Sequence, residues 1–150
     1  MKIRKLKKFE KNYIKECDKL FVDFMKSESK YDDNAIVLEE YASFAKDLEK
    51  ENKHMYVALE DEKVVAFLYS TVEKSKVMKV PVAHINYIYV KDEYRHKGIA
   101  FSLFKKVMQD YQTIDIENIE LNVFNDNEFA VRLYEKIGFK PVYTNYKLKL

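Results

Sequence analysis

The chain has 150 residues, and 27 Lys and Arg against 25 Asp and Glu give it a formal net charge of +2. This near balance argues against nucleic acid as the main partner, and no apolar run approaches the ~20 residues of a membrane span. The single cysteine, Cys17, excludes a disulfide within the chain, which fits a cytoplasmic protein. We expect one domain over residues 1–150, with neither nucleic acid nor a membrane as a partner.

The first third of the chain predicts an edge strand and two helices. Residues 2–8 alternate in part between apolar and basic side chains, as edge strands do. Apolar side chains then recur at helical spacing from Phe9 to Met25 and again from Leu38 to Leu48. Cys17 falls on the apolar stripe of the first helix, so we expect a buried structural thiol there.

Three strands follow in the middle of the chain. The apolar runs Met55–Leu59 and Val64–Val72 flank a charged turn and predict a β-hairpin. The run Val80–Val90 is almost continuously apolar, with many β-branched and aromatic residues. Such a run is typical of a central strand that is covered on both faces.

The last third alternates between helix and strand. The pattern predicts helices over Ala100–Tyr111 and Phe129–Ile137, and strands over Ile116–Phe124 and Val142–Leu150. The complete order is β-α-α-β-β-β-α-β-α-β, which predicts an α/β (α+β) fold with a mixed central sheet flanked by helices. Because exposed edge strands invite pairing, the pattern leaves a homodimer through the C-terminal strands open.

A basic turn containing one glycine links Val80–Val90 to the next helix. A helix N-terminus presents unpaired N–H groups and a partial positive charge, which together favour a phosphate group. Gly98 lets the backbone approach such a group without a Cβ in the way. The turn is neither a P-loop nor a dinucleotide fingerprint. An ordinary helix cap is the alternative interpretation, since the turn alone is a weak signal.

Two blocks of sequence resemble the GNAT superfamily of acyl-coenzyme A N-acetyltransferases. The first is Arg95-x-x-Gly98-x-Ala100, which is similar to the family's marker between its fourth strand and third helix. The second is Asn127-x-x-Ala130-x-x-Leu133-Tyr134-Glu135-Lys136-x-Gly138-Phe139. With their flanks, the two blocks extend the resemblance over roughly residues 80–146, and they contain both glycines of the chain.

The resemblance implies an acetyltransferase that takes acetyl-coenzyme A as co-substrate, uses no metal, and acetylates an amine acceptor by direct attack in a ternary complex. A β-bulge would separate the fourth and fifth strands to admit the pantetheine arm. Tyr134 would protonate the leaving thiolate. The donor would be held by Asn127, by the backbone of the fourth strand and by the turn, that is by Ile88, Tyr89, Val90, Arg95, His96, Lys97, Gly98, Ile99 and Ala100.

The residue that removes a proton from the amine stays open between several candidates. His84 begins the central strand, and the unperturbed pKa of histidine near ~6.5 suits this role. Glu120 on the polar side of the next strand is a second candidate, and a water chain without a dedicated base is a third. Charged and aromatic side chains near the first two helices could attract an amine or form an ordinary solvated face, namely Tyr31, Asp32, Asp33, Glu39 and Glu40.

Two other functions compete with the enzyme. A module that binds an acyl-coenzyme A for sensing or interaction would keep the donor site without catalysis. A nucleic-acid binder would use the basic segment Lys2–Lys15, against the balanced charge of the whole chain. The sequence leaves open whether the acceptor is a small molecule or a peptide or protein, and whether the acyl group is larger than acetyl.

Overall fold

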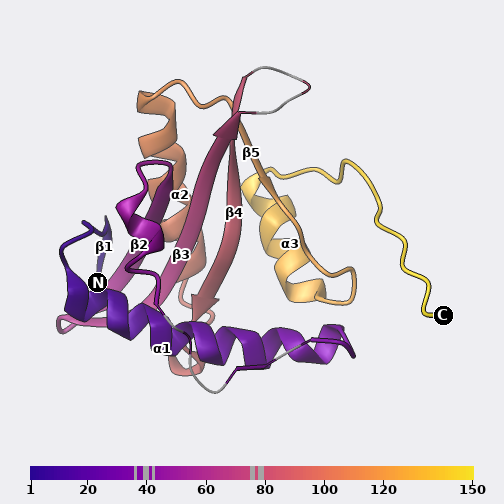
Figure 1. Cartoon of the computed structure of the whole chain (residues 1–150), viewed down its shortest axis with the longest axis horizontal. Coiled ribbons are helices and arrows are strands. Elements are labelled where there is room, and N and C mark those ends of the chain that lie inside the picture. Colours follow the sequence, from indigo (N-terminus) through magenta and orange to yellow (C-terminus); the bar gives the residue numbers. More distant parts are fainter. Residues whose placement is uncertain (36, 39–40, 42, 75–76, 78–79) are drawn as a thin grey trace.

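The computed structural model describes residues 1–35, 37–38, 41, 43–74, 77 and 80–150 (Figure 1). Short 3₁₀ turns occur at Ser29–Tyr31, Asp47–Glu49 and Asp92–Tyr94. A mixed sheet flanked by helices confirms the predicted fold class. The main elements of the described residues are β1 (Lys2–Lys5), α1 (Lys11–Glu28), β2 (Lys53–Glu60), β3 (Lys63–Lys74), β4 (Pro81–Val90), α2 (Ile99–Thr113), β5 (Asn118–Leu121) and α3 (Glu128–Ile137).

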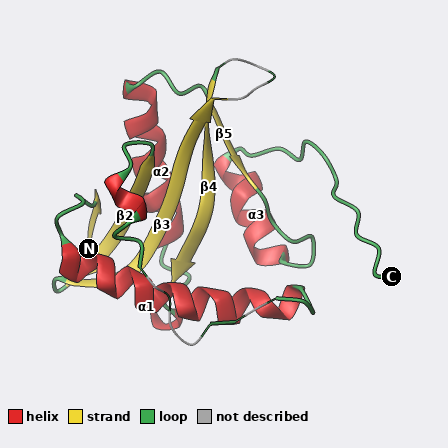
Figure 2. Cartoon of the chain, in the orientation of Figure 1, coloured by secondary structure: helices red, strands yellow, loops and turns green. Residues whose placement is uncertain are grey.

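The five strands form one sheet in the order β1-β2-β3-β4-β5 (Figure 2). The first four strands run antiparallel to their neighbours, and β5 runs parallel to β4. A two-residue turn joins β2 to β3, with Asp61 and Glu62 both at positive φ. Two positive φ values at these places match the twist of a tight hairpin, so the predicted hairpin is confirmed.

Each face of the sheet carries its own hydrophobic core. The core under α1 contains Ile14, Cys17 and Phe44, and the core on the other face contains Leu103, Phe104 and the residues that α3 adds at its rim. Cys17 has no exposed surface, and burial raises the pKa of its thiol far above the ordinary value. A thiol that does not ionise is a poor nucleophile, so the prediction of a buried structural cysteine is confirmed.

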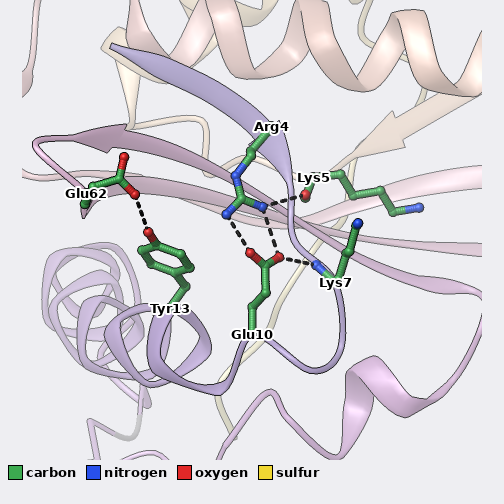
Figure 3. A network of polar contacts seen from close by, with 6 residues as sticks. All are labelled: Arg4, Lys5, Lys7, Glu10, Tyr13 and Glu62. Carbon is green, nitrogen blue, oxygen red and sulfur yellow. Dashed lines mark hydrogen bonds and ion pairs between the residues drawn. The ribbon is translucent and has the colours of Figure 1, made fainter.

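Polar contacts fasten α1 to the first strand and the hairpin (Figure 3). The Glu10 carboxylate accepts hydrogen bonds from both terminal nitrogens of Arg4, at 3.0 and 2.6 Å, and from the Lys7 N–H at 2.7 Å. Farther along the helix, the Tyr13 hydroxyl donates to Glu62 at 2.7 Å. These contacts set the direction of α1 across the sheet, so that its C-terminal end lies where β4 ends.

A β-bulge at Asn86 divides β4 into two parts. In the ladder with β3, Tyr69 is paired with Tyr87 but Ser70 is paired with Ile85, so Asn86 is the extra residue. Pairing with β5 runs from Val82 to Ile85, where Ile85 faces Leu121. The predicted bulge and the predicted separation of β4 from β5 are therefore present beyond Ile85.

The prediction of a fully covered central strand at Val80–Val90 is wrong. The middle strand is β3, in which the run Val64–Thr71 is buried, whereas β4 is mostly half-buried. Apolar side chains on both faces of β4 remain partly open because its partner β5 leaves the strand half-way. The continuous apolar run therefore has two causes. Its side chains contact the cores on both faces of the sheet, and its second half also lines the opening beside β5.

The prediction of a second helix over Leu38–Leu48 is wrong for the described part of this range. The regular structure there is the single turn Asp47–Glu49. The Phe44 N–H donates to the Asp18 carboxylate at 2.8 Å, and the Ala45 N–H donates to the Ser43 hydroxyl at 2.9 Å. Side chains thus take backbone donors that a helix would need. Residues 39 and 40, suggested as acceptor-site carboxylates, lie outside the described residues.

The predicted strand over Val142–Leu150 is likewise absent from the structure. Residues 140–150 are extended but belong to no ladder, and all of them are exposed. Figure 1 shows this tail, in yellow, running away from the top of α3. The alternating pattern is present in the sequence, but none of the strands in the described residues pairs with this segment.

Candidate functional site

The turn between β4 and α2 has the backbone of an anion-binding loop. His96 and Gly98 both have positive φ, 61° and 76°, and Gly98 is the residue before the first turn of α2. Within the described residues, no side chain caps this helix start, so its first N–H groups stay available. A Cβ at Gly98 would meet no atom of the protein within 4 Å. The left-handed backbone therefore favours glycine here, and the space in front of it is open.

Arg95 holds the turn against the end of β4. Its Nε donates to the Val90 carbonyl at 3.0 Å, its NH2 lies 3.1 Å from the Asp92 carboxylate, and its guanidinium lies over the Tyr89 ring. A planar guanidinium with several donors suits such a shared role. Two of the three guanidinium nitrogens of Arg95 thus already have partners within the protein.

The other two basic side chains of the turn lie on aromatic rings. The Lys97 ammonium is 5.3 Å from the centre of the Tyr94 ring. The His96 ring meets the Phe129 ring edge-on, with 5.2 Å between their centres. Because Phe129 belongs to α3, this contact ties the turn to the helix that carries the second sequence block.

The backbone of β4 beyond the bulge is divided between β3 and the opening. The Lys91 N–H donates to the Val65 carbonyl of β3 at 3.0 Å. Since successive residues of a strand point their backbone groups to opposite sides, Tyr89 is directed toward β3, and Ile88 and Val90 toward the side that β5 has left. Of the three predicted strand residues, Ile88 and Val90 therefore face the opening with their backbone, and Tyr89 does not.

Asn86 is a residue of this region that the sequence interpretation missed. Its Oδ1 atom is buried and has no hydrogen-bond partner among the described residues. Leaving a buried polar atom unpaired costs about 1–3 kcal/mol, so the Asn86 oxygen is a candidate acceptor for a donor group of a ligand. An asparagine inside an apolar strand sequence is the signal that could have drawn attention to it.

Tyr134 and Asn127 come from α3. The side-chain Oδ1 atom of Asn127 accepts from the Ala130 N–H at 3.2 Å and caps the helix. The side-chain NH₂ group is left for a ligand. The Tyr134 ring packs edge-on against Phe104 and Phe139. Burial, with a smaller contribution from the Glu28 carboxylate, raises the pKa of Tyr134 to about 12. The phenol therefore keeps its proton at neutral pH.

Glu28, at the end of α1, is a second residue that sequence analysis missed. Burial raises the pKa of its carboxyl group, and the nearby Lys30 lowers it in part. Its charge also acts on Tyr134, although α1 and α3 cover opposite faces of the sheet. Glu28 is the last residue of α1, so the end of this helix brings a carboxyl group within electrostatic reach of Tyr134. A glutamate in a polar break between helices gave no signal that distinguished it.

His84 and Glu120, the two candidate bases, are partners in the parallel ladder between β4 and β5. Their neighbours Ala83, Ile85, Ile119 and Leu121 belong to the core under α2. Because side chains alternate along a strand, His84 and Glu120 both project toward the α1 face. The fold thus brings together two residues that the sequence offered as alternatives.

A groove of about 610 Å³ lies between the C-terminal half of α1 and the end of β4. Other suggested acceptor residues are engaged elsewhere: Tyr31 stacks on Phe124, and Asp32 pairs with Lys147 at 3.1 Å. Asp33 is exposed. The groove carries charges of both signs, since it is lined by Asp23, Lys26, Ser27, Lys30, Tyr89, Lys91, Asp92, Glu93 and Arg95.

The described residues contain no group of three or more His, Cys, Asp or Glu side chains arranged to hold a metal ion. None of the helices found in them is long and apolar enough to span a membrane.

Comparison with known families decides the class of this site. The model of the acetyltransferase (GNAT) family matches residues 15–139. The chain belongs to the GNAT family. The matched range includes the turn at Arg95–Ala100, the opening beyond Ile85 and the helix of Tyr134.

Individual relatives support the assignment to the GNAT family. The N-alpha-acetyltransferase of Saccharolobus solfataricus is 33% identical over 109 residues, which are 68% of this chain and 65% of that protein. The match thus spans slightly less than two thirds of this relative. A mutant BH1408 protein from Bacillus halodurans has a TM-score of 0.86 at 18% identity, over 100% of this chain and 99% of that chain. Aminoglycoside N-acetyltransferase AAC(6')-Iy in complex with CoA has a TM-score of 0.70 at 14% identity, over 99% and 100%. At these identities the structures show the shared fold.

Proposed function

We propose that this GNAT protein is an N-acetyltransferase that moves an acetyl group from acetyl-coenzyme A to an amine in a ternary complex. One observation carries the proposal: β5 leaves β4 after Ile85, and β4 then runs through open backbone groups to the uncapped start of α2. An opening between strands that leads to a helix N-terminus suits an extended molecule with a pyrophosphate along its length. The complex of AAC(6')-Iy with CoA gives the same ligand class for a protein of this fold.

The donor would be held mainly by backbone groups. The N–H groups from His96 to Ala100 would bind the pyrophosphate, helped by the charges of Arg95 and Lys97. The backbone of Ile88 and the amide NH₂ of Asn127 would bind the pantetheine arm. Asn86, with its unpaired buried oxygen, could accept an N–H from that arm. These assignments need no rearrangement of the β3–β4 ladder.

Acetyl-coenzyme A supplies the activated acetyl thioester when bound. The Ile88 N–H, which lacks a β5 partner, is the donor that we assign to the thioester carbonyl, because a fixed donor stabilises the negative charge that develops there. Tyr134 would donate its proton to the leaving sulfur. Its raised pKa keeps that proton in place until it is needed.

For the proton of the amine, we propose the pair His84 and Glu120. A carboxylate beside an imidazole orients the ring by accepting a hydrogen bond from one of its nitrogens. Glu28 would attract the acceptor as an ammonium ion from the α1 side before His84 removes the proton. This division of roles is supported by the register that pairs His84 with Glu120 on the α1 face of the sheet and by the position of Glu28 at the end of α1.

Peptide N-terminal amines are the first acceptors to test, since the 33% identical relative is an N-alpha-acetyltransferase. An aminoglycoside is the second, from the name of AAC(6')-Iy. The groove beside α1 carries carboxylates and cations together. Charges of both signs suit an acceptor with polar groups beyond its amine, such as a peptide.

Titration calorimetry with acetyl-coenzyme A tests the donor site. We expect binding that competes with free coenzyme A, and absence of heat at millimolar ligand would refute the proposal. Thiol release with a panel of amines then tests turnover. Donor binding without turnover on any amine would favour the sensing module instead.

Three matched variants test the roles around the amine. His84→Ala should lower kcat about a hundredfold, because it removes the group that accepts the proton, and Glu120→Gln should lower it less. Glu28→Gln should raise KM for the amine more than it lowers kcat. An unchanged kcat in His84→Ala would return the base to Glu28 or to water.

A further inference from the structure

The outer side of α1 carries a row of lysines. The exposed residues of this helix are Lys11, Asn12, Lys15, Lys19, Asp23 and Lys26. At about 3.6 residues per turn, the four lysines among them, called the lysine row below, point away from the buried residues Ile14, Cys17 and Phe21. With a rise of about 1.5 Å per residue, the row is about 22 Å long. Figure 1 shows α1 lying outside one face of the sheet, so this side of the helix faces solvent.

The carboxylates of the same helix are mostly turned inward. Glu16 accepts a backbone N–H of β3 at 2.6 Å, and Asp18 accepts the Phe44 N–H at 2.8 Å. Glu28 is half-buried, so Asp23 is the one carboxylate among the exposed residues of α1. The near balance of charge over the whole chain, which argues against nucleic acid in the sequence, therefore conceals a one-sided distribution. Folding takes acidic side chains of α1 into backbone hydrogen bonds and leaves the basic ones outside.

Most of the lysine row has no ionic partner in the protein. Lys11 lies 3.7 Å from the Glu49 carboxylate. Within the part of the chain that the structure describes, Lys15, Lys19 and Lys26 form no ion pair. Like charges four residues apart on a helix repel each other. A negatively charged polymer along the row would remove this repulsion and neutralise several lysines at once.

An exposed aromatic ring stands at the start of the lysine row. Phe9 is 70% exposed, and the Lys7 ammonium lies 5.7 Å from the centre of its ring. Proteins that bind single-stranded nucleic acid combine a stacking ring with a line of cations that follows the phosphates. A lipid surface suits this side of α1 less well, because an interfacial helix inserts its apolar side, and that side of α1 is buried in the core.

We propose that the outer side of α1 binds single-stranded RNA, with phosphates along the lysine row and a base on Phe9. RNA suits this surface better than DNA, because its loops and ends present unpaired bases and the exposed Asn12 amide can bond a 2′-hydroxyl. Since phosphate contacts carry no sequence information, the binding would depend little on sequence. This inference does not rest on the acetyltransferase proposal, because its tests measure RNA binding.

Fluorescence anisotropy of a short labelled oligouridylate measures the binding. We expect the logarithm of the affinity to fall with the logarithm of the salt concentration, with a slope of about −2 to −3, because each neutralised phosphate contributes roughly −0.7. Asn12→Ala should bring the affinities for RNA and for DNA of the same length together. Absence of binding at low salt would overturn the proposal, and tighter binding of the DNA to the unsubstituted protein would overturn the choice of RNA.

Two double variants with the same change in net charge test the location. Lys15→Gln with Lys19→Gln removes two charges from the lysine row. It should weaken binding about tenfold or more at low salt and make the salt slope shallower by about 1.4. Lys105→Gln with Lys136→Gln removes two exposed charges from α2 and α3 and should leave the affinity nearly unchanged. Equal effects would contradict the proposed surface. All four lysines are exposed, so folding is not at risk.

Phe9→Ala distinguishes RNA from other polyanions. It should weaken binding of the oligouridylate about fivefold or more, because a stacked base is lost, and should leave binding of inorganic polyphosphate nearly unchanged. Equal losses for the two ligands would contradict base stacking on Phe9. Cosedimentation of the protein with phosphatidylserine vesicles, without binding of the oligouridylate, would assign the lysine row to a membrane and overturn the proposal.

Discussion

The ladder between β2 and β3 and the ladder between β4 and β5 differ in length and in how completely they are covered. Toward β2, the ladder runs over the whole of β2, from Lys53 to Glu60, and nearly every residue in it is buried. Toward β5, β4 is paired for four residues only, Val82–Ile85, and the rest of the strand is half-buried. The β2–β3 ladder, called the complete side below, contributes mainly to stability. The β4–β5 ladder, called the incomplete side, leaves backbone groups of β4 unpaired at an opening. The incomplete ladder is therefore the part of the sheet where function is to be sought.

The largest expected effect concerns the incomplete side. Tyr134→Phe removes the proposed acid and should lower turnover about a hundredfold, while acetyl-coenzyme A affinity stays nearly unchanged. Rates of thiol release and a calorimetric titration measure the two quantities. Tyr143→Phe, in the exposed tail, is the matched control and should keep full turnover. If Tyr134→Phe turns over normally, the tyrosine is a packing residue.

The complete side should respond in stability instead. The Tyr111 hydroxyl is hydrogen-bonded to Ser70 and lies 2.9 Å from the His54 Nδ1 atom, and both partners are buried. Tyr111→Phe leaves these groups unpaired and should lower the free energy of unfolding by about 1–3 kcal/mol. The buried Tyr69 hydroxyl has no partner among the described residues, so Tyr69→Phe should cost close to nothing. Denaturant titrations measure both, and equal losses would contradict this account.

The two glycines allow the same comparison within one residue type. Gly98 and Gly138 both have positive φ and open space where a Cβ would lie. Alanine at either position should destabilise the fold by about 1–2 kcal/mol, because a left-handed backbone is costly for it. Gly98→Ala alone should also weaken acetyl-coenzyme A binding, by roughly tenfold, since its methyl would meet the phosphates. Equal acetyl-coenzyme A affinity of Gly98→Ala and Gly138→Ala would show that the phosphates do not bind at this turn.

The smallest expected effect is a pH dependence of the free energy of unfolding, caused by His54 on the complete side. Burial lowers the pKa of His54, chiefly by desolvating its charged form. The unfolded chain then takes up a proton more readily than the folded one, so the free energy of unfolding should fall as the pH drops below about 6.5. Melting temperatures across that range measure the slope. It should flatten in His54→Gln, and an unchanged slope would assign the effect to other groups.

The sequence predicted the parts of the fold that depend on neighbouring residues. The stripe through Ile14 and Cys17 predicts a helix because its period is local, and the turn around Gly98 is recognisable because its backbone demands a rare conformation. The sequence predicted the fold less well where contacts between residues far apart in the chain determine the local structure. Asp18 captures the Phe44 N–H and prevents a helix, a contact across 26 positions in the chain. The apolar runs of β3 and β4 look alike in sequence, and their burial differs only because β5 ends its pairing early.

The candidate site shows the same division. Apart from Asn86, the residues proposed for its donor side all came from the sequence, because two compact motifs contain most of them; these roles stay predictions. Glu28 was missed because its environment comes from burial at the end of α1 and from its proximity to Tyr134. His84 and Glu120 were identified separately, and their pairing became visible through the register of β4 with β5.

Because of the bulge at Asn86, the number of residues in β4 determines which side chains face which core. Before Asn86, odd-numbered residues such as Ile85 face the core of α2, and after it even-numbered residues such as Ile88 do. Tyr87 and Tyr89 are thereby assigned to the core of α1. Deleting one residue here would exchange the two surfaces of the strand's second half. Evolution can therefore vary the amino acids of this segment far more freely than it can insert or remove one.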